Sequence, residues 1–400
     1  MALNVRYGNA LPNSLPSRSS FLLPASRDIM IQLASNFGNR SVRVIGAGAF
    51  VPSHVVDNAR ITQAIPGWSS EWIAEKTEIR ERRFLWELDA EAGVTVAPAA
   101  VAGEPATNTD MCEAALRRAL EMAGIEGSEL DALFLVTCTP DRVNFSHDAM
   151  EVHRRLGCRS DAYALMIDDG CGGTPYVMDM VNRMIRSGAI GTAAVIGSAF
   201  TSSLVDRDVW CGTVAPAPGR KGIPAAFGAY VFGDGAGAVV LRGDGAPGEG
   251  IVASMSGNDY LQLVIRRAGG IEARLAPETN RADEAFVVDG QLVARSYPAF
   301  MNACIAGVLD QRPELGPKVQ RYYFHQPNKR LLDHFVRQSG LPADRVACNV
   351  DRYGNTSAAG MLILLAEDLE QGVVQLGRGD LVLIAAVGAN VHYGAQLIRL

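Results

Sequence analysis

Short apolar runs alternate along most of the chain with segments whose apolar residues repeat at helical spacing. Such runs are typical of buried strands, and the segments between them are typical of amphipathic helices. Strands that alternate with helices predict a parallel-rich, layered α/β fold. The rhythm occurs in both halves of the chain, which suggests a duplication. The expected strands cover residues 42–50, 133–139, 164–167, 193–200, 229–241, 251–256, 321–324, 380–387 and 391–399.

Three segments break this rhythm. Residues 1–40 are rich in Ser, Asn, Leu and Pro, and we expect an extension that packs on the surface or is partly mobile, with a targeting role as the alternative. Residues 85–109 are interpreted as an inserted loop, and residues 206–224 as a long mobile lid. The expected helices cover residues 110–123, 147–156, 174–187, 296–311, 329–339 and 357–370.

A further helix is expected to begin at Ser69 and to lead into a basic stretch that ends at Arg83. The ordinary interpretation of such a charge run is a solvated helix face. The alternative is a nucleotide contact, because an aromatic ring lies beside several cations there.

The composition of the 400 residues, 48% hydrophobic and 20% charged, is that of a soluble globular enzyme. A net charge of -6 argues against a general nucleic-acid binder, and no apolar run reaches the length of a membrane span. The seven cysteines form no CxxC pair or His/Cys cluster, so we expect reduced thiols in the cytoplasm and no metal site. A lone GxG at residues 46–48 is too weak to indicate a dinucleotide site.

One cysteine lies at the tip of a Gly-rich turn between a strand and a helix. The apolar run 164–167 is interpreted as a buried strand, and the helix begins near Thr174 and Pro175. The positive end of a helix dipole favours a thiolate, so we expect a lowered pKa for the Cys171 thiol. This stretch alone fits a nucleophile and a buried structural cysteine equally well.

Two more polar residues stand next to predicted strands or helices. His325 follows the strand 321–324, and Asn355 precedes the helix that starts at residue 357. Taken singly, His325 is explained as a core histidine and Asn355 as a helix N-cap. Catalytic groups in α/β folds gather at strand ends. Together with Cys171, these residues resemble a nucleophile with two polarising partners.

In four longer motifs the chain resembles the β-ketoacyl-acyl-carrier-protein synthase III family of the thiolase superfamily, from about residue 42 to residue 400. The motifs are Glu71-Trp72-Ile73 with Ile79-Arg80-Glu81-Arg82-Arg83, Gly233-Asp234-Gly235-Ala236-Gly237-Ala238, His325-Gln326-Pro327-Asn328, and Gly354-Asn355-Thr356-Ser357-Ala358-Ala359.

The resemblance implies a thiolase-like α/β fold in which two related βαβαβαββ halves form a five-layered α-β-α-β-α core. The expected divisions are an extension at residues 1–41, a first half at 42–245 that carries the nucleophile, and a second half at 246–400 that carries the histidine and asparagine.

The resemblance also implies a reaction. Cys171 would accept an acyl group from a thioester, and His325 and Asn355 would hold a malonyl-type thioester while it loses carbon dioxide. The backbone N–H groups of Cys171 and Ala389 would form the oxyanion hole. Coenzyme A or acyl-carrier-protein thioesters would serve as substrates, with no cofactor, no nucleic acid and no membrane involved.

Less firmly, the resemblance implies binding roles. Trp72 corresponds to a ring that stacks on the adenine of coenzyme A, and Lys76 stands where the family usually has an arginine. Arg330 corresponds to a basic residue at the pantetheine channel, where it can also meet the acidic carrier protein. Phe145 corresponds to a residue that crosses to close the acyl pocket of the partner, which implies a homodimer.

Departures from the family pattern surround the nucleophile. The turn reads Cys171-Gly172-Gly173-Thr174-Pro175 where Cys-Ala-Gly-Phe is usual, acidic Asp168-Asp169 precedes it, and Gly388-Ala389-Asn390 replaces three glycines. We therefore expect a specialised member that serves a secondary-metabolite pathway. Two alternatives stay open: acyl transfer from Cys171 to an oxygen or nitrogen nucleophile without decarboxylation, and a non-catalytic partner subunit.

Overall fold

The structure is a computed structural model that describes residues 40–99, 101, 103–215, 221–268 and 280–400. Nearly all of the predicted extension 1–41 lies outside these residues, as does part of the predicted lid at 206–224. The described residues belong to one compact unit.

The first half of the chain builds a five-stranded mixed sheet. In spatial order its strands are β1 (Ser41–Phe50), β11 (Gly235–Gly245), β8 (Thr192–Ala199), β6 (Ala132–Thr137) and β7 (Tyr163–Asp168). β8, β6 and β7 run parallel, whereas β11 is antiparallel to both β8 and β1. β6 and β8 are buried along their whole length, which explains their continuous apolar runs.

The second half repeats this arrangement. The sheet order is β12 (Gly250–Asn258), β17 (His392–Arg399), β16 (Leu381–Val387) and β15 (Arg321–Phe324). β15 and β16 are parallel, and β17 is antiparallel to both of its neighbours. A single parallel bridge from Tyr322 to Val346 stands beyond β15, where the first sheet has its fifth strand. The same order and the same strand directions in both halves fit a duplication.

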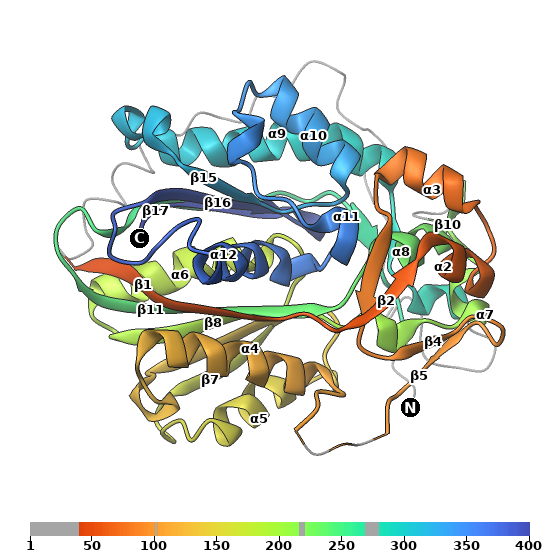
Figure 1. Ribbon diagram of the computed structural model, residues 1–400, viewed down its shortest axis with the longest axis horizontal. Helices are drawn as coiled ribbons and strands as arrows, with labels where there is room; N and C mark the ends of the chain where they lie inside the picture. The colour runs from red at the N-terminus through yellow and green to blue at the C-terminus, as the bar shows by residue number, and fades with distance from the viewer. Residues whose placement is uncertain (1–39, 100, 102, 216–220, 269–279) are drawn as a thin grey trace, which may run out of the picture. The chain divides into compact units, whose positions relative to one another are not determined.

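Helices complete five layers (Figure 1). α4 (Asn108–Ala123) and α5 (His147–Arg155) cover the outer face of the first sheet, and α9 (Gly290–Leu309) and α10 (Lys329–Gln338) cover that of the second. α6 (Gly173–Ser187) and α12 (Gly360–Glu370) lie between the sheets. Residues 361–366 of α12 are all buried, as expected for a helix that is apolar on every side. The predicted α-β-α-β-α thiolase-like architecture is confirmed.

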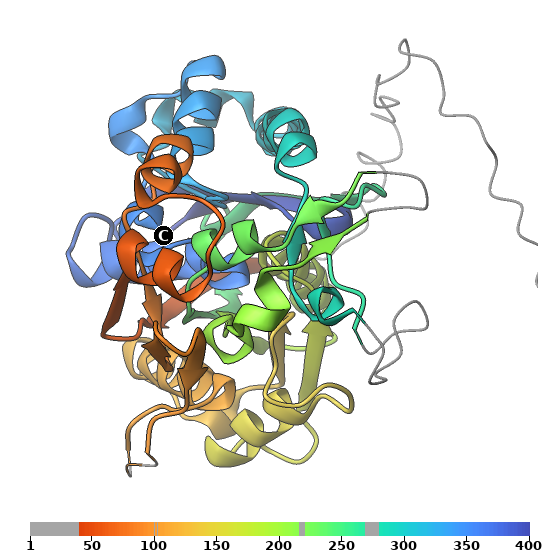
Figure 2. The same cartoon turned by 90° about the vertical axis from the view of Figure 1, so that its right-hand side faces the viewer.

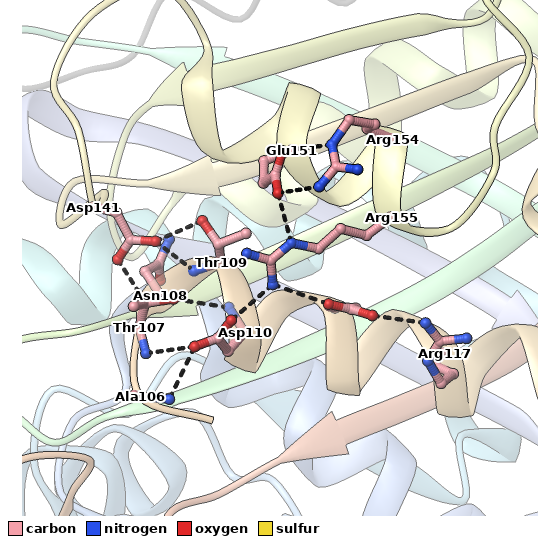
Figure 3. A network of polar contacts seen from close by, with 11 residues as sticks. Ala106, Thr107, Asn108, Thr109, Asp110, Arg117, Asp141, Glu151, Arg154 and Arg155 are labelled. Atoms are coloured by element: carbon pink, nitrogen blue, oxygen red, sulfur yellow. Dashed lines mark hydrogen bonds and ion pairs between the residues drawn. The ribbon is translucent and has the colours of Figure 1, made fainter. Parts of the chain in front are cut away.

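A polar network joins the two outer helices of the first sheet (Figure 3). Arg155 of α5 binds Asp110 of α4 at 2.7 Å, Glu113 at 3.1 Å and Glu151 at 2.8 Å. Asp110 is also the N3 residue of a capping box with Thr107, so the same carboxylate begins α4 and anchors α5.

Short elements gather at one end of the layers, on the right in Figure 1. This end faces the viewer in Figure 2. This end carries a mainly apolar cluster that includes buried Trp210 and Tyr230. The elements are β2 (His54–Asp57), α2 (Asn58–Ala64), α3 (Ser70–Thr77), β3 (Glu81–Phe84), β4 (Glu87–Asp89), β5 (Val94–Val96), α7 (Arg207–Trp210), β9 (Thr213–Val214), β10 (Ile223–Pro224), α8 (Ala226–Val231), β13 (Val264–Ile265), β14 (Val287–Val288) and α11 (Val350–Tyr353).

Short 3-10 helices connect these parts of the fold. They are η1 (Gly127–Glu129), η2 (Ser202–Leu204), η3 (Arg281–Glu284), η4 (Pro313–Lys318), η5 (Ala343–Arg345), η6 (Ser357–Ala359) and η7 (Ala389–Val391).

Within the described residues, α9 is long and apolar enough to span a membrane by length and composition. It packs against β12, β16 and β17, and Tyr297, Met301 and Cys304 on its inner face are buried in the core. The helix therefore has a place in the core of this fold, which accounts for its apolar composition.

The helix predicted to begin at Ser69 is present as α3, with Ser69 as its N-cap, but the basic stretch after it is not helical. α3 ends at Thr77 because Glu78 adopts the left-handed conformation and caps the helix. The basic stretch then forms β3, and Arg82 is completely buried with hydrogen bonds to the carbonyl groups of Val56 and Tyr230. The interpretation of a solvated helix face is wrong for this arginine, because tertiary packing places its side chain in the core.

Four other sequence expectations are corrected. β7 is an edge strand whose Tyr163 and Leu165 are exposed, so the prediction of a buried strand there is wrong. The predicted strand 229–241 begins only at Gly235, because residues 226–231 form α8. The predicted loop 85–109 contains the hairpin β4–β5, and segment 206–224 contains α7, β9 and β10.

Candidate active site

Cys171 lies in the turn that links edge strand β7 to central helix α6. Gly172 is the N-cap of α6, so Cys171 stands one residue before the N-cap. The turn is closed by a hydrogen bond from the Gly173 N–H to the Gly170 carbonyl at 3.0 Å. The side chain is nearly buried, with 9% of the residue exposed. The strand, turn and helix expected around this cysteine are present.

The prediction of a lowered thiol pKa is wrong. The pKa of Cys171 is raised to about 11, mainly by burial and to a smaller extent by the Asp169 carboxylate, while hydrogen bonds from Ser357 and Asn355 act against this rise. The Ser357 hydroxyl lies 3.6 Å from Sγ. Removal of the sulfur from water outweighs the helix dipole, so the resting nucleophile is a protonated thiol.

His325 follows the end of β15. Its backbone N–H donates to the Ala385 carbonyl at 2.9 Å, and its own carbonyl accepts from the Tyr297 hydroxyl at 2.5 Å. These bonds fix the backbone that presents the imidazole. Burial lowers the pKa of His325 to about 3, so the ring is neutral near pH 7 and offers one N–H donor.

Asn355 is held from both sides of its peptide backbone. Its N–H donates to the Val231 carbonyl at 2.7 Å, and its carbonyl accepts from the Gly233 N–H at 3.1 Å. The side-chain Oδ1 accepts from the Ser357 N–H at 2.9 Å. This bond closes a local turn, but the N-caps of η6 and α12 are Thr356 and Ala359, so the interpretation of Asn355 as a helix N-cap is wrong. The amide NH₂ remains available as a donor toward Cys171.

The structure brings these three residues together in one cleft of about 910 Å³. Apolar side chains form much of its wall, and cations stand among its lining residues. The predicted residues that line it are Trp72, Lys76, Cys171, His325, Arg330, Asn355 and Ala389. Among the described residues no group of three or more His, Cys, Asp or Glu is arranged to hold a metal ion.

The turn that carries Ala389 packs directly on the nucleophile turn. A Cβ added at Gly172 would overlap the His392 carbonyl oxygen and lie 2.6 Å from the Gly388 nitrogen. A Cβ added at Gly388 would overlap the Gly172 nitrogen. Two glycines are therefore needed for the contact that brings the backbones of Cys171 and Ala389 together, as an oxyanion hole requires.

Helices α3 and α10 supply part of the cleft wall. Lys76 forms an ion pair with Glu75 at 2.6 Å, and Arg330 donates to the Glu75 carbonyl at 2.8 Å. Trp72 stacks on Trp68 with ring centroids 4.5 Å apart. Sequence reasoning missed Trp68, although the four-residue spacing of the two tryptophans was a visible signal.

Phe145 stands apart from this cleft. It is 92% exposed and adopts a positive φ of 60°, as do its neighbours Asn144 and Ser146. It lines a separate surface hollow together with Val143 and Met150. The predicted contact of Phe145 with a partner subunit therefore stays a prediction.

Two regions of the chain match families of known proteins. Residues 166–259 match 3-oxoacyl-[acyl-carrier-protein (ACP)] synthase III, and residues 316–400 match the C-terminal region of that family. A beta-ketoacyl-[acyl-carrier-protein] synthase III from Rhodospirillum centenum is 31% identical over 363 residues, which cover 90% of this chain and 99% of the relative. The chain belongs to the β-ketoacyl-acyl-carrier-protein synthase III family.

Solved structures agree with this assignment to the synthase III family. The 3-oxoacyl-[acyl-carrier-protein] synthase III from Aquifex aeolicus VF5 matches with a TM-score of 0.70 at 27% identity, covering 90% of this chain and 100% of that chain. The priming β-ketosynthase of the R1128 polyketide biosynthetic pathway matches with a TM-score of 0.69 at 25% identity, covering 91% and 97%. The protein is thus a β-ketoacyl synthase III-like condensing enzyme, an acyltransferase with the thiolase fold.

The departures from the usual synthase III pattern lie next to the nucleophile. Asn390 adopts a positive φ of 51°, which asparagine tolerates better than most residues, and Val391 follows at 62°. A β-branched residue in this conformation is strained, and such strain concentrates at functional sites. The turn with fewer glycines thus keeps a tight conformation at the cost of local strain.

Proposed function

We propose that an acyl thioester loads its acyl group onto Cys171, and that a malonyl-type thioester is then condensed with it to give a β-ketoacyl product. The observation that carries this proposal is the single cleft lined by Cys171, His325 and Asn355. The thiol comes from the first half of the chain, and the imidazole and amide come from the second. Both halves are needed to complete the site.

In the first step Sγ of Cys171 attacks the carbonyl carbon of the donor thioester. The carbon–sulfur bond of the donor breaks, and the thiol proton leaves with the departing thiol. The negative oxygen formed on the way meets the backbone N–H groups of Cys171 and Ala389. Because these donors are fixed before the reaction, they stabilise that charge without reorganisation.

In the second step the malonyl carboxylate leaves as carbon dioxide, and its electron pair forms an enolate. The enolate oxygen accepts hydrogen bonds from the neutral imidazole of His325 and the amide of Asn355. The enolate carbon then attacks the acyl group, the bond to Sγ breaks, and the Cys171 thiolate takes a proton from water. Thiol, imidazole, amide and backbone N–H groups suffice for these steps, so we propose no resident cofactor.

The substrates are thioesters of coenzyme A, of acyl carrier protein, or of both. Trp72, Lys76 and Arg330 line the cleft at the ends of α3 and α10 where a nucleotide or pantetheine would enter. Lys76 offers a point charge in place of the planar fork of an arginine, which weakens any stacked contact with a base. A carrier-protein donor would depend less on that contact.

A homodimer is supported by the surface around β7. This strand is one of the two edge strands of the first sheet, and an unpaired apolar edge favours association with another chain. Several large apolar side chains near it are exposed: Val143, Phe145, Met150, Tyr163 and Leu165. A patch of this kind is typical of an interface.

We further infer a specialised role in secondary metabolism, carried out in the cytoplasm. The altered turns around Cys171 support the first inference, as does the likeness to a priming ketosynthase. The cysteines support the second, since all seven are free thiols.

Covalent loading of Cys171 followed by carbon dioxide release tests the proposed reaction. The full chain is incubated with a panel of acyl thioesters, and intact-protein and peptide mass spectrometry locates the adduct. Malonyl thioester is then added and carbon dioxide is measured. Cys171→Ala should lose the adduct, whereas Cys211→Ala, at an exposed cysteine, should keep it. Asn355→Ala should keep the adduct and lower carbon dioxide release about 100-fold or more.

Each other outcome identifies an alternative function. An adduct without carbon dioxide, discharged by hydroxyl or amine acceptors, would establish acyl transfer without decarboxylation. The lack of any adduct with every donor would establish a non-catalytic partner subunit.

A further inference from the structure

A carboxylate and an imidazole connect the two turns that meet at the nucleophile. Asp169 stands two residues before Cys171, and His392 is the first residue of β17, three residues after Ala389. His392 Nδ1 lies 2.7 Å from Asp169 Oδ2. The carboxylate is nearly buried, with 7% of its side chain exposed, while the imidazole is 42% exposed. Asp169 belongs to the first half of the chain and His392 to the second.

His392 touches the nucleophile region in two further ways. Its carbonyl accepts from the Gly388 N–H at 2.9 Å and lies against Gly172, so its backbone is part of the turn contact. Its ring stacks on Tyr176 of α6 with centroids 4.6 Å apart. The imidazole is thus fixed between the helix that follows Cys171 and the carboxylate that precedes it.

The charge of Asp169 acts directly on the thiol. Apart from burial, this carboxylate is the group that raises the pKa of Cys171. The same carboxylate raises the pKa of His392, through the hydrogen bond first and its charge second, although partial burial opposes the rise. A protonated His392 therefore offsets a charge that otherwise hinders ionisation of the nucleophile.

We propose that Asp169 and His392 are a pair of positioning residues that hold the nucleophile turn against the Ala389 turn, and that protonated His392 shields Cys171 from the Asp169 carboxylate. The pair deepens the proposed function, because it matters for acyl loading only if Cys171 is the nucleophile. It also gives a use to the acidic residue that departs from the usual pattern. At a pH low enough to protonate His392, acyl loading of Cys171 is then faster than it would be with a neutral residue at position 392.

Other ionisable groups surround the pair and act on both wild type and variants. They are Cys138, Asp168 and Cys171 near the carboxylate, Tyr176 against the ring, Asp259 next to the end of β12, and Arg266 acting on Asp168. These ionisable groups are present in wild type and in the His392 variant. Their direct effect on the reactivity of Cys171 therefore cancels when the wild-type rate constant is divided by the variant rate constant at the same pH.

The test measures the reactivity of Cys171 with methyl methanethiosulfonate in the full chain from pH 6 to pH 9. The modified Cys171 peptide is quantified by mass spectrometry. For His392→Gln the ratio of wild-type to variant rate constants should be several-fold at pH 6 and approach one at pH 9, because only a protonated imidazole shields the charge. Asp169→Asn should react several-fold faster than wild type at pH 9. In the Asp169→Asn background the effect of His392→Gln should vanish.

A purely structural tie makes different predictions. It would give a ratio for His392→Gln that does not change with pH, or an Asp169→Asn variant that is slower than wild type throughout, and either result overturns the proposal. His54→Gln, at a histidine on β2 away from the cleft, is the matched control and should leave the rates unchanged. His392→Gln is expected to slow the reaction of Cys171 at pH 6, and Asp169→Asn is expected to speed it at pH 9. If one variant fails to fold, the other therefore still tests the proposal.

This readout does not depend on condensation. If Cys171 forms no acyl adduct, the proposed function fails while the thiol rates still report on the pair. If the adduct forms and the ratios are flat with pH, the pair proposal alone fails.

Discussion

At the scale of single residues, burial rather than sequence position sets the chemistry. Burial keeps the Cys171 thiol protonated at rest and the His325 imidazole neutral. A neutral imidazole beside an amide is a suitable pair of donors for an enolate oxygen, because neither gives up its proton to the carboxylate that must leave. Because of the same burial, the folded chain keeps His325 neutral in acid, whereas the unfolded chain binds a proton at this histidine. Acid therefore favours the unfolded chain through this residue.

His325 should make the stability of the fold depend on pH. Its pKa is about 3 in the folded chain against 6.5 for an unperturbed histidine, so between these values the unfolded chain binds a proton that the folded chain does not. The free energy of unfolding should therefore fall by about 2 kcal/mol from pH 7 to pH 5 through this group alone. Urea titrations of wild type and His325→Asn measure the difference between the two pH values.

The comparison has a control in the same cleft. Asn355→Ala removes a side chain that does not titrate, and its stability should differ from wild type by the same amount at pH 7 and pH 5. Parallel pH curves for wild type and His325→Asn would show that His325 titrates normally in the folded chain.

At the scale of elements, two turns from different halves define the site by contact between their backbones. β7 leads to the turn before α6, and β16 leads to the turn before β17. Gly172 and Gly388 both have negative φ values, of -88° and -126°, so neither glycine is needed for its torsion angle. Both positions need glycine for a steric reason, because a Cβ on either residue would overlap the opposite backbone.

Gly172→Ala should destabilise the fold by roughly 2 kcal/mol or more, since the added methyl group has no room. It should also slow acyl loading, because the two turns must separate. Differential scanning calorimetry and adduct formation are the measurements. Gly316→Ala is the matched control, because a Cβ there would meet Leu309 at 3.5 Å, an ordinary contact. A Gly172→Ala variant as stable and active as this control would contradict the packing argument.

At the scale of the whole molecule, two sheets of matching topology enclose two central helices, and β7 forms one edge of the first sheet. The five layers bury α6 and α12, whose N-terminal ends point the nucleophile turn and the Asn355 segment into the same cleft. This edge strand lies directly before the nucleophile turn. Association through this edge would rest on the strand that positions Cys171.

Leu165→Asp should convert the proposed dimer into monomers, because a charge would replace an apolar side chain that is 47% exposed on β7. Light scattering coupled to size-exclusion chromatography gives the mass directly. Val373→Asp, at an apolar side chain that is 46% exposed away from this edge, should leave the mass unchanged. A wild-type mass equal to one chain would rule out the dimer.

Much of the fold followed from sequence pattern where strands are buried on both faces. The bounds of β6, β8 and β16 were predicted within a few residues, because a continuous apolar run of this length indicates a strand that is buried on both faces. Short elements were missed where tertiary contacts override local pattern. The strand β3 within a basic stretch, with Arg82 fully buried, is the plainest case. A local charge count gives no sign of such burial.

The sequence by itself determined the residue types of the site and the family motifs that carry them: a cysteine on a Gly-rich turn, a histidine after a strand and an asparagine before a helix. It also determined the layered α/β class, because hydrophobic period reflects local geometry. Only the tertiary structure decided the ionisation of Cys171 and His325, the glycine contact between the turns and the pairing of Asp169 with His392. Desolvation and close approach arise between segments more than 200 residues apart in the chain, as the Asp169–His392 separation of 223 shows, and no local pattern encodes them.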